Sequence, residues 1–299
     1  MPNREPNSIG VTLGLLGDQW NLLLVQQALL GRTRFGEFLD ALPISTAVLT
    51  ARLRTLAASG VLEHRPYGTS ASRAEYVLTD AGGALWPVLL SIWAWERRWA
   101  DPPATGALPA MVHQGGCGQS FAPALTCRAC ESAVEVADLH AEWGPSGGWP
   151  RSVPAASTRR QRGVSPADVG LFPDTMSLIG NRWALALLGA CLLGLSRFGE
   201  FERALQAPPT VVSDRVRTFV DLGVLAPDGT TGAYRLTEKG RAVLPTIVLA
   251  LGWGERWHPA PEGPALVLTH PGCGAVFVAQ LCCDRCRGVL RAAAVRVGA

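Results

Sequence analysis

The sequence contains two copies of one domain. The pentapeptide Arg-Phe-Gly-Glu-Phe at residues 34–38 returns unchanged at 197–201. Other residues match in the same order, at offsets that shorten along the chain: Trp20 with Trp183, Arg54 with Arg217, Trp95 with Trp253, Cys117 with Cys273 and Cys130 with Cys286. A period this long indicates a duplicated domain rather than a solenoid unit of roughly 20–50 residues. The shortened offsets indicate shorter loops in the second copy.

Length and composition limit the class of protein. The chain has 299 residues, enough for two domains that each bury a core, and its 48% hydrophobic content excludes a disordered protein. The net charge of +3 does not by itself indicate a polyanionic partner. We expect no signal peptide, and no membrane span because Pro87 and Pro245 interrupt apolar runs that are already short. We therefore expect a cytoplasmic, nucleoid-associated protein whose eight cysteines serve metal or redox chemistry.

Apolar spacing and breaker residues predict the same elements in each copy, mainly helical with a small amount of strand. In the first copy we expect a helix over 11–30, a short helix over 34–42, a third from Ser45 to Gly60, strands over 62–65 and 74–78, and a long helix over 79–100 kinked at Pro87. The third helix directs Val48, Leu49, Leu53 and Leu56 inward. Its outer face then carries Thr46, Thr50 and Arg54. This arrangement predicts a winged helix-turn-helix.

Several spaced motifs resemble one known family. They are Leu-Leu-Gly-x-x-Trp at 15–20, the pentapeptide at 34–38, Ile-Ser-x-x-Val-Leu-Thr-x-Arg-Leu-Arg-x-Leu at 44–56, Gly-Val-Leu at 60–62 and Tyr-x-Leu-Thr-x-x-Gly at 76–82, and the second copy repeats most of them. The set is similar to the HxlR-type (MarR-like) winged-helix transcription regulators. The resemblance implies a regulator of double-stranded DNA, most simply a repressor that occludes a promoter.

The resemblance also implies an assembly. Family members are usually single-copy homodimers whose terminal helices pack together, so the fusion resembles a covalent pseudo-dimer, with further homodimerisation left open. Some members sense oxidants through a Cys-Pro near the N-terminus, but the comparable stretches 6–10 and 166–170 contain no Cys. The alternative function is a protein-interaction adaptor that contacts the transcription machinery through the second copy or the cysteine modules. A footprinted site bound with strongly salt-dependent affinity favours the regulator, and weak DNA binding without sequence preference favours the adaptor.

We expect DNA contacts from the outer face of the third helix, from basic residues beside it and from the wing. The candidate residues are Arg34, Ser45, Thr46, Thr50, Arg52, Arg54, Arg65 and Arg73 in the first copy, and Arg197, Ser213, Arg215 and Arg217 in the second. The copies are unequal, because Ala51 becomes Asp214 and the second hairpin segment, at 226–233, is five residues shorter and contains an Asp but no Arg. We therefore expect the first copy to be the stronger reader of sequence. The alternative is that both copies bind alike.

Each copy ends in a cysteine module. His113 and Cys117 precede Cys127 and Cys130, and His270 and Cys273 precede Cys283 and Cys286. Two such pairs about nine residues apart are typical of a zinc ribbon, in which four ligands close a structural tetrahedron. We therefore expect two structural Zn²⁺ ions, one for each copy. His140 is an alternative ligand to His113, Cys282 an alternative to Cys283, and reduced cysteines without metal a third possibility.

These features predict five segments: a first winged domain at 1–101, a first zinc-ribbon-like module at 102–143, a Gly/Pro/Arg-rich linker at 144–173, a second winged domain at 174–259 and a second module at 260–299. An arginine run at 157–162 is expected to be solvated linker charge, with phosphate contact as the alternative. Cys191 lies in an apolar helix and is expected to be a core thiol. Trp93, Trp95, Trp99, Trp253 and Trp257 are expected to pack the copies together, and a small-molecule pocket between the long helices stays open. No nucleophile–base pair or phosphate-binding loop is evident, so we do not expect an enzyme.

Overall fold

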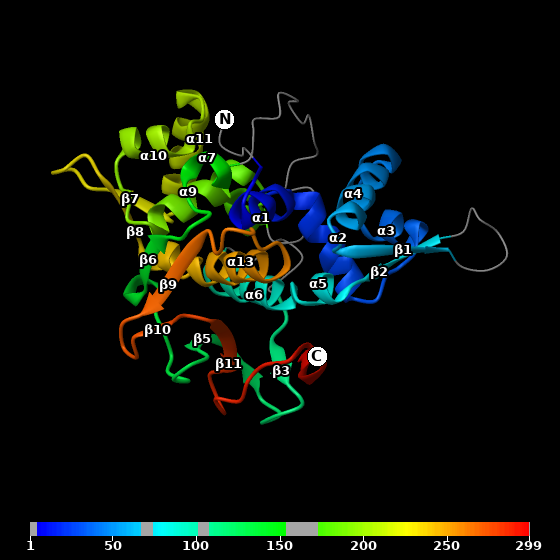
Figure 1. Cartoon of the computed structure of the whole chain (residues 1–299). Coiled ribbons are helices and arrows are strands. Elements are labelled where there is room, and N and C mark those ends of the chain that lie inside the picture. Colours follow the sequence, from blue (N-terminus) through cyan, green and yellow to red (C-terminus); the bar gives the residue numbers. More distant parts are fainter. Residues whose placement is uncertain (1–4, 67–73, 101–107, 154–172, 299) are drawn as a thin grey trace.

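The computed structural model describes residues 5–66, 74–100, 108–153 and 173–298 (Figure 1). The first copy contains α1 (Ser8–Leu16), α2 (Gln19–Leu29), α3 (Phe35–Ala41), α4 (Thr46–Ala58), β1 (Leu62–Pro66), β2 (Ala74–Leu78), α5 (Asp80–Gly83) and α6 (Trp86–Trp99). The second contains α8 (Pro173–Ile179), α9 (Arg182–Leu192), α10 (Phe198–Leu205), α11 (Pro209–Asp221), β7 (Leu225–Pro227), β8 (Tyr234–Leu236), α12 (Glu238–Arg241) and α13 (Leu244–Trp257). The order is the same in both copies, which confirms the tandem winged-helix fold. None of the helices in these ranges is long and apolar enough to cross a bilayer.

The predicted helix over 11–30 is two helices, α1 and α2. The break lies at Gly17 and Asp18, where the first copy meets the second. A Cβ on Gly17 would lie 2.4 Å from the Leu13 carbonyl oxygen and 2.6 Å from the Arg182 Cα, so only glycine allows this approach. Asp18 caps α2 by accepting a hydrogen bond from the Trp20 N–H at 3.0 Å, and its backbone bridges to Asn181, its own counterpart in the repeat.

The expected kink at Pro87 is also corrected. Pro87 lies in the first turn of α6, after the separate short helix α5, and Pro245 occupies the same place in α13. A proline in the first turn has no hydrogen bond to lose, because the first N–H groups of a helix are unpaired in any case. The prolines therefore start the long helices and leave them uninterrupted.

The long helices α6 and α13 pack together and join the copies. Ser91 and Thr246 share a buried hydrogen bond of 2.8 Å between their hydroxyl groups. Trp95 donates its indole N–H to the Lys239 carbonyl at 3.0 Å, and Trp253 donates to the Ala81 carbonyl at 2.8 Å. Both donors and both acceptors are counterparts in the repeat, so the two bonds are related by a pseudo-two-fold axis. In addition, α1 packs on α13 and α8 packs on α6, so each copy's first helix contacts the other copy's long helix.

The strands of the two cysteine modules pair mainly with one another. The first module supplies β3 (Met111–His113), β4 (Ser120–Phe121), β5 (Pro123–Cys127) and β6 (His140–Trp143), and the second β9 (Leu266–His270), β10 (Ala275–Val276), β11 (Ala279–Cys283) and β12 (Val295–Val297). Antiparallel pairs form between β5 and β11, β6 and β9, and β3 and β12. Leu125 lies opposite Leu281, its counterpart, so the same pseudo-two-fold axis passes between β5 and β11. The modules are therefore interlaced.

Short 3-10 turns at Val136–Asp138 and Ala292–Ala294 complete the modules. After the first module in the chain, α7 (Trp149–Ser152) lies against α1, and the Asn7 side chain donates to the Ser146 carbonyl at 3.0 Å. The predicted linker thus begins with an ordered segment, and the arginine run at 157–162 lies outside the described residues. Figure 1 shows α4 with its wing at one end of the molecule, α11 with its wing at the other, α6 and α13 between them, and the interlaced modules on the side away from α4 and α11.

Candidate nucleic-acid interface and metal centres

The outer face of α4 is exposed. Ser45 caps the helix, accepting from the Val48 N–H at 3.4 Å. Thr46, Ala51 and Arg54 are exposed, while Thr50 is half-buried and donates its hydroxyl hydrogen to the Thr46 carbonyl at 2.8 Å. Short side chains on the first turns of α4, followed by one long cation past its middle, suit an approach to base edges in a major groove.

Arg52, two residues before Arg54, has a different environment. Its guanidinium lies 2.7 Å from the Asp18 carboxylate, and the two side chains are 22% and 17% exposed. The same carboxylate caps α2. Arg52 therefore links α4 to the start of α2, a role that its spacing in the sequence did not indicate. The sequence feature that could have indicated this role is Asp18, an acidic residue directly before α2.

The remaining candidates of the first copy lie near α4. Arg34 is exposed at the start of α3, where Glu37 accepts from the Thr33 and Arg34 N–H groups at 2.8 and 2.9 Å. These backbone donors lower the pKa of Glu37. Arg65 is exposed on the wing and pairs with Glu63 at 2.6 Å. Arg73 lies outside the described residues.

The second copy presents a different set of charges. Asn181 stands where the first copy has Asp18, so the counterpart of Arg52 has no carboxylate there, and Arg215 pairs instead with the neighbouring Asp214. Asp214 is 57% exposed, so the outer face of α11 carries a negative charge that α4 lacks. Arg197 and Arg217 are exposed, and Ser213 is half-buried.

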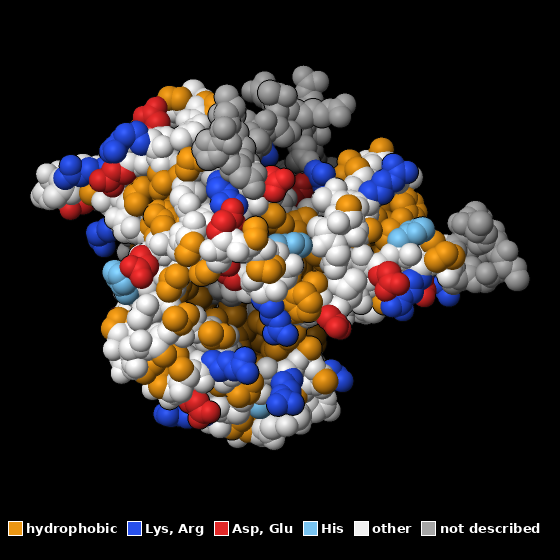
Figure 2. Space-filling model, viewed as in Figure 1, with side chains coloured by type: hydrophobic (Ala, Val, Ile, Leu, Met, Phe, Trp, Pro, Cys, Tyr) orange, Lys and Arg blue, Asp and Glu red, His pale blue; other side chains and the backbone are white. Residues whose placement is uncertain are grey.

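The two wings also differ. At the tip of the β7–β8 wing, Asp228 accepts hydrogen bonds from the Thr230 hydroxyl at 2.6 Å, the Thr230 N–H at 2.9 Å and the Thr231 hydroxyl at 2.8 Å. These donors, the Thr230 hydroxyl first, lower the pKa of Asp228 to about 2. The second wing therefore ends in a closed turn with a fixed negative charge. In Figure 2, basic and acidic side chains are interspersed over the visible face, so any DNA contact depends on the placement of charges.

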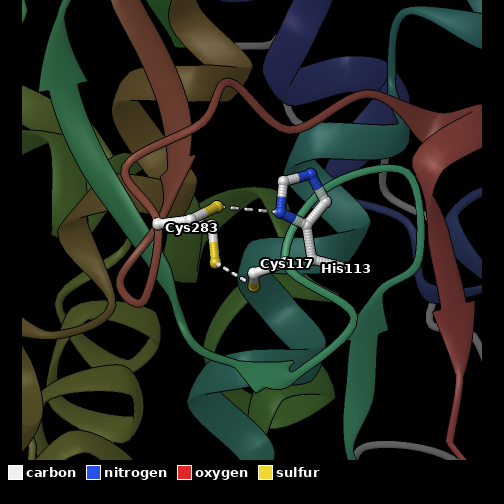
Figure 3. A group of neighbouring side chains, drawn as sticks. His113, Cys117 and Cys283 are labelled. Atoms are coloured by element: carbon white, nitrogen blue, oxygen red, sulfur yellow. Dashed lines mark hydrogen bonds between the residues drawn. The ribbon is translucent and has the colours of Figure 1, made fainter.

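All eight predicted metal ligands meet in two groups of four. One group is His113, Cys117, Cys283 and Cys286, and the other is Cys127, Cys130, His270 and Cys273. The ligand atoms of each group lie within 4.8 Å of one another. The expected grouping, with four ligands from one copy, is thus corrected: each group takes two ligands from each copy. Figure 3 shows His113 and Cys117 converging with Cys283, which comes from the C-terminal segment.

The distances fit a tetrahedral metal site. Metal–sulfur bonds of about 2.3 Å and metal–nitrogen bonds of about 2.0–2.1 Å place tetrahedral sulfur pairs about 3.8 Å apart and sulfur–nitrogen pairs about 3.6 Å apart. The Cys117–Cys283 and Cys127–Cys273 Sγ atoms are 3.8 and 4.0 Å apart. The His113 Nδ1 lies 3.3 Å from the Cys286 Sγ, and the His270 Nδ1 lies 3.3 Å from the Cys273 Sγ. The six thiols of the two groups are free of disulfide bonds, so they are available as ligands.

The backbone turns carry the ligands in the same way in both groups. Glu131 and Arg287, which follow the Cys-x-x-Cys pairs, have positive φ angles of 60° and 58°. A Cβ on Gly116 would lie 2.2 Å from the His113 ring, so glycine is needed where the turn passes the imidazole. The Ser132 N–H lowers the pKa of Cys130 to about 6, and the Gly288 N–H lowers that of Cys286 to about 7. The second cysteine of each Cys-x-x-Cys turn is therefore favoured as the thiolate that binds metal, whereas burial raises the pKa of Cys283.

Three other residues of the sequence analysis lie apart from the two groups. His140 is exposed beside Glu142, with 3.9 Å between the imidazole and the carboxylate. Cys282 is buried against Thr126, with its Sγ 3.4 Å from the hydroxyl oxygen. Burial raises the pKa of Cys191 to about 12. A thiol of this kind is not reactive at neutral pH.

Comparisons with known proteins identify a family and several relatives. The sequence model of the HxlR-like helix-turn-helix family matches residues 15–104 and 178–262. An HTH-type transcriptional regulator of Mycobacterium tuberculosis is 37% identical over 116 residues, covering 37% of this chain and 73% of that protein. The HTH-type transcriptional regulator YvaP of Bacillus subtilis is 42% identical over 89 residues, covering 29% of this chain and 82% of that protein. The solved structure of a candidate transcription factor of Pseudomonas aeruginosa, PA1374, is 28% identical, covers 48% of this chain and 97% of its own, and superposes with a TM-score of 0.36.

The two regions matched by the family together span more than half of the chain, and each coincides with one of the winged helix-turn-helix copies. The chain therefore belongs to the HxlR-like helix-turn-helix family of transcription regulators.

Proposed function

We propose that the protein regulates transcription by binding double-stranded DNA sequence-specifically, with its two winged-helix copies acting as one covalent pseudo-dimer. The observation that supports this most is the exposed outer face of α4, in a chain whose family is one of transcription regulators. In this proposal Thr46, Thr50 and Arg54 contact base edges, whereas Arg34 and Arg65 contact phosphates.

The pseudo-two-fold relation of the copies supports two half-sites. A two-fold protein places its recognition helices in major grooves one helical turn of DNA apart, about 34–36 Å, or a multiple of that distance. In Figure 1, α4 and α11 lie on the same side of the molecule, at its two ends. The proposed half-sites are unequal, because Asp214 on α11 repels phosphate and the second wing ends in Asp228 rather than a cation. The first copy then contributes most of the sequence preference.

Occlusion of a promoter is the simplest consequence of such binding, which makes the protein a repressor that works in the cytoplasm. It needs no catalytic step. The two Cys₃His groups hold structural Zn²⁺ in this proposal, because four protein ligands complete the tetrahedron and leave no position for a reacting water. When bound, the metal supplies cross-linking of the turns that carry its ligands.

DNA binding by the full-length protein tests the proposal. Footprinting on the promoter region of the gene that encodes this protein is expected to show a protected site. The affinity for this site is expected to fall steeply as the salt concentration rises. Arg54→Ala is expected to weaken binding by ~1–3 kcal/mol if the residue contacts a base. Arg217→Ala, its counterpart in the second copy, is the matched control and is expected to weaken binding less. Weak binding without sequence preference, equal for both variants and wild type, contradicts the proposal and favours the adaptor.

A further inference from the structure

The two metal groups are built across the copies. Each group combines a His-Cys turn of one copy with the Cys-x-x-Cys turn of the other. We propose that the two groups bind two tetrahedral, thiophilic divalent ions such as Zn²⁺, and that these ions clasp the two copies together. The clasps fix the distance between the two DNA-binding ends, and this last consequence rests on the proposed function.

The register of the shared strands separates the two clasps. In the antiparallel β5–β11 pair, Cys127 lies opposite Ala279 and Cys283 lies opposite Pro123. The two Cys-x-x-Cys turns therefore leave opposite ends of a ladder of four residue steps, which is about 14 Å at roughly 3.4 Å per step. Each turn there meets the His-Cys turn of the other copy. A site made within one copy would need its Cys-x-x-Cys turn to cross that distance and break the β5–β11 pairing.

Further contacts repeat this exchange around the same axis. The Arg128 N–H donates to the Val278 carbonyl at 3.0 Å, and the Asp284 N–H donates to the Ala122 carbonyl at 3.2 Å. These two bonds are counterparts in the repeat. The Asp284 carboxylate also accepts from the Ala122 N–H at 2.9 Å. The exchanged pairing is therefore supported by backbone bonds beside the ligands as well as by the ligands themselves.

The clasps lie next to the helices that orient the DNA-binding ends. β5 contacts α6, and β11 contacts α13. Because α6 and α13 join the two winged-helix copies, a tetrahedral ion that ties the modules together also restricts how these helices move relative to one another. Without the ions, the α6–α13 contact and the peptide chain still connect the copies. We therefore expect metal removal to loosen the spacing of the two ends without abolishing the binding of each end.

Two double variants distinguish shared clasps from sites within one copy. In the shared arrangement, Cys117→Ser with Cys283→Ser damages one site and leaves the other complete. Cys117→Ser with Cys127→Ser then damages both. Metal content of the purified full-length variants is measured by elemental analysis and by the visible spectrum after cobalt loading. We expect one ion per chain for the Cys117→Ser, Cys283→Ser variant and none for the Cys117→Ser, Cys127→Ser variant. The reverse result overturns the proposal.

If neither double variant folds, the wild-type chain decides. After metal removal under reducing conditions, a short reagent that bridges two thiols, such as dibromobimane, is expected to join Cys117 to Cys283 and Cys127 to Cys273, because these Sγ pairs are 3.8 and 4.0 Å apart. Mass spectrometry of the digested protein identifies the pairs. Bridges between Cys117 and Cys127 and between Cys273 and Cys283 overturn the proposal. Bridges inside a Cys-x-x-Cys turn form in both arrangements and serve as the labelling control.

The metal measurements do not involve DNA, so the two proposals fail separately. With a duplex that carries both half-sites, chelation is expected to reduce affinity at least tenfold, while a duplex with one half-site changes less than twofold. Equal losses on the two duplexes overturn the spacing role of the clasps. Absence of specific binding by the metal-loaded protein overturns the proposed function, whereas the metal counts and thiol bridges still decide whether the clasps exist.

Discussion

Two arginines two positions apart on α4 are expected to act differently. Arg52 pairs with Asp18 at 2.7 Å, whereas Arg54 is exposed. We predict that Arg52→Ala lowers the free energy of unfolding and changes DNA affinity little. We predict the opposite for Arg54→Ala.

The size of the Arg52 effect follows from its burial. Exposed ion pairs contribute about 0–1 kcal/mol, and removal of one partner from a fully buried pair costs about 3–5 kcal/mol. The Arg52 and Asp18 side chains are 22% and 17% exposed, between these limits. Asp18 retains its cap on α2 when Arg52 is removed, which reduces the cost of leaving its charge behind. We therefore expect a loss of about 1–2 kcal/mol of stability. For Arg54→Ala, loss of a phosphate contact would reduce the salt slope of binding by about 1, and loss of a base contact would cost about 1–3 kcal/mol.

Urea unfolding followed by tryptophan fluorescence measures the first quantity, and fluorescence anisotropy of a labelled duplex at several salt concentrations measures the second. Arg215→Ala is the matched control for Arg52→Ala. Asn181 replaces Asp18 in that copy, and the remaining partner of Arg215, Asp214, is 57% exposed. Its removal is expected to cost less than about 1 kcal/mol. If Arg52→Ala leaves unfolding unchanged but removes sequence preference, Arg52 contacts DNA and the reasoning from the ion pair is refuted.

Three further predictions concern single positions. Gly17→Ala is expected to destabilise the chain by about 1–3 kcal/mol in urea unfolding, because its Cβ would lie 2.6 Å from the Arg182 Cα. The control, Gly14→Ala, is at an exposed helical position with open space around it and is expected to be neutral or to stabilise by up to about 1 kcal/mol. Equal effects of the two substitutions would contradict the close approach at Gly17. Burial raises the pKa of Glu96, which accepts from the Thr175 N–H at 2.8 Å, so its stabilising effect is fully present below the unfolded-state pKa and is lost as pH rises through the folded-state pKa. Glu96→Gln should therefore flatten the dependence of unfolding free energy on pH above about 4.3, the ordinary Glu pKa, and an unchanged slope would show that Glu96 does not titrate in this window. Asp214→Ala is expected to tighten DNA binding and to raise the contribution of the second half-site in anisotropy titrations, and no gain at low salt would place α11 away from DNA.

Much of the fold was predictable because its determinants are local. The winged-helix order follows from helical spacing, from Ser45 as a helix cap and from the strand runs on either side of the wing, and the repetition of the pattern made it specific. The predictions that were wrong concern places where segments distant in the sequence meet. Gly17 was expected inside a helix, because the sequence does not show that the Arg182 backbone lies beside it. Pro87 indicated a kink because the end of α5 before it was not evident.

The candidate sites show the same division. The turn spacing picked out all eight residues that gather in the two Cys₃His groups, because a Cys-x-x-Cys or His-Cys turn is a local structure. Their grouping was not predictable, since identical turns occur in both copies and either pairing gives three thiolates and one imidazole per site. The register of β5 with β11, which joins residues far apart in the sequence, selects between the two. Likewise, the Arg52–Asp18 pair joins residues on two helices, and the repeat marks it only by the change of Asp18 to Asn181.

The central claim is that the two winged-helix copies bind two half-sites of one DNA site. The most direct test is to select preferred duplexes from a random pool with the full-length, metal-loaded protein. We predict enrichment of a bipartite sequence with one well-defined and one weaker half-site, separated by a fixed spacing close to one or two turns of DNA. A pool that stays random after repeated rounds, or a single half-site with no second element at any fixed distance, would contradict it.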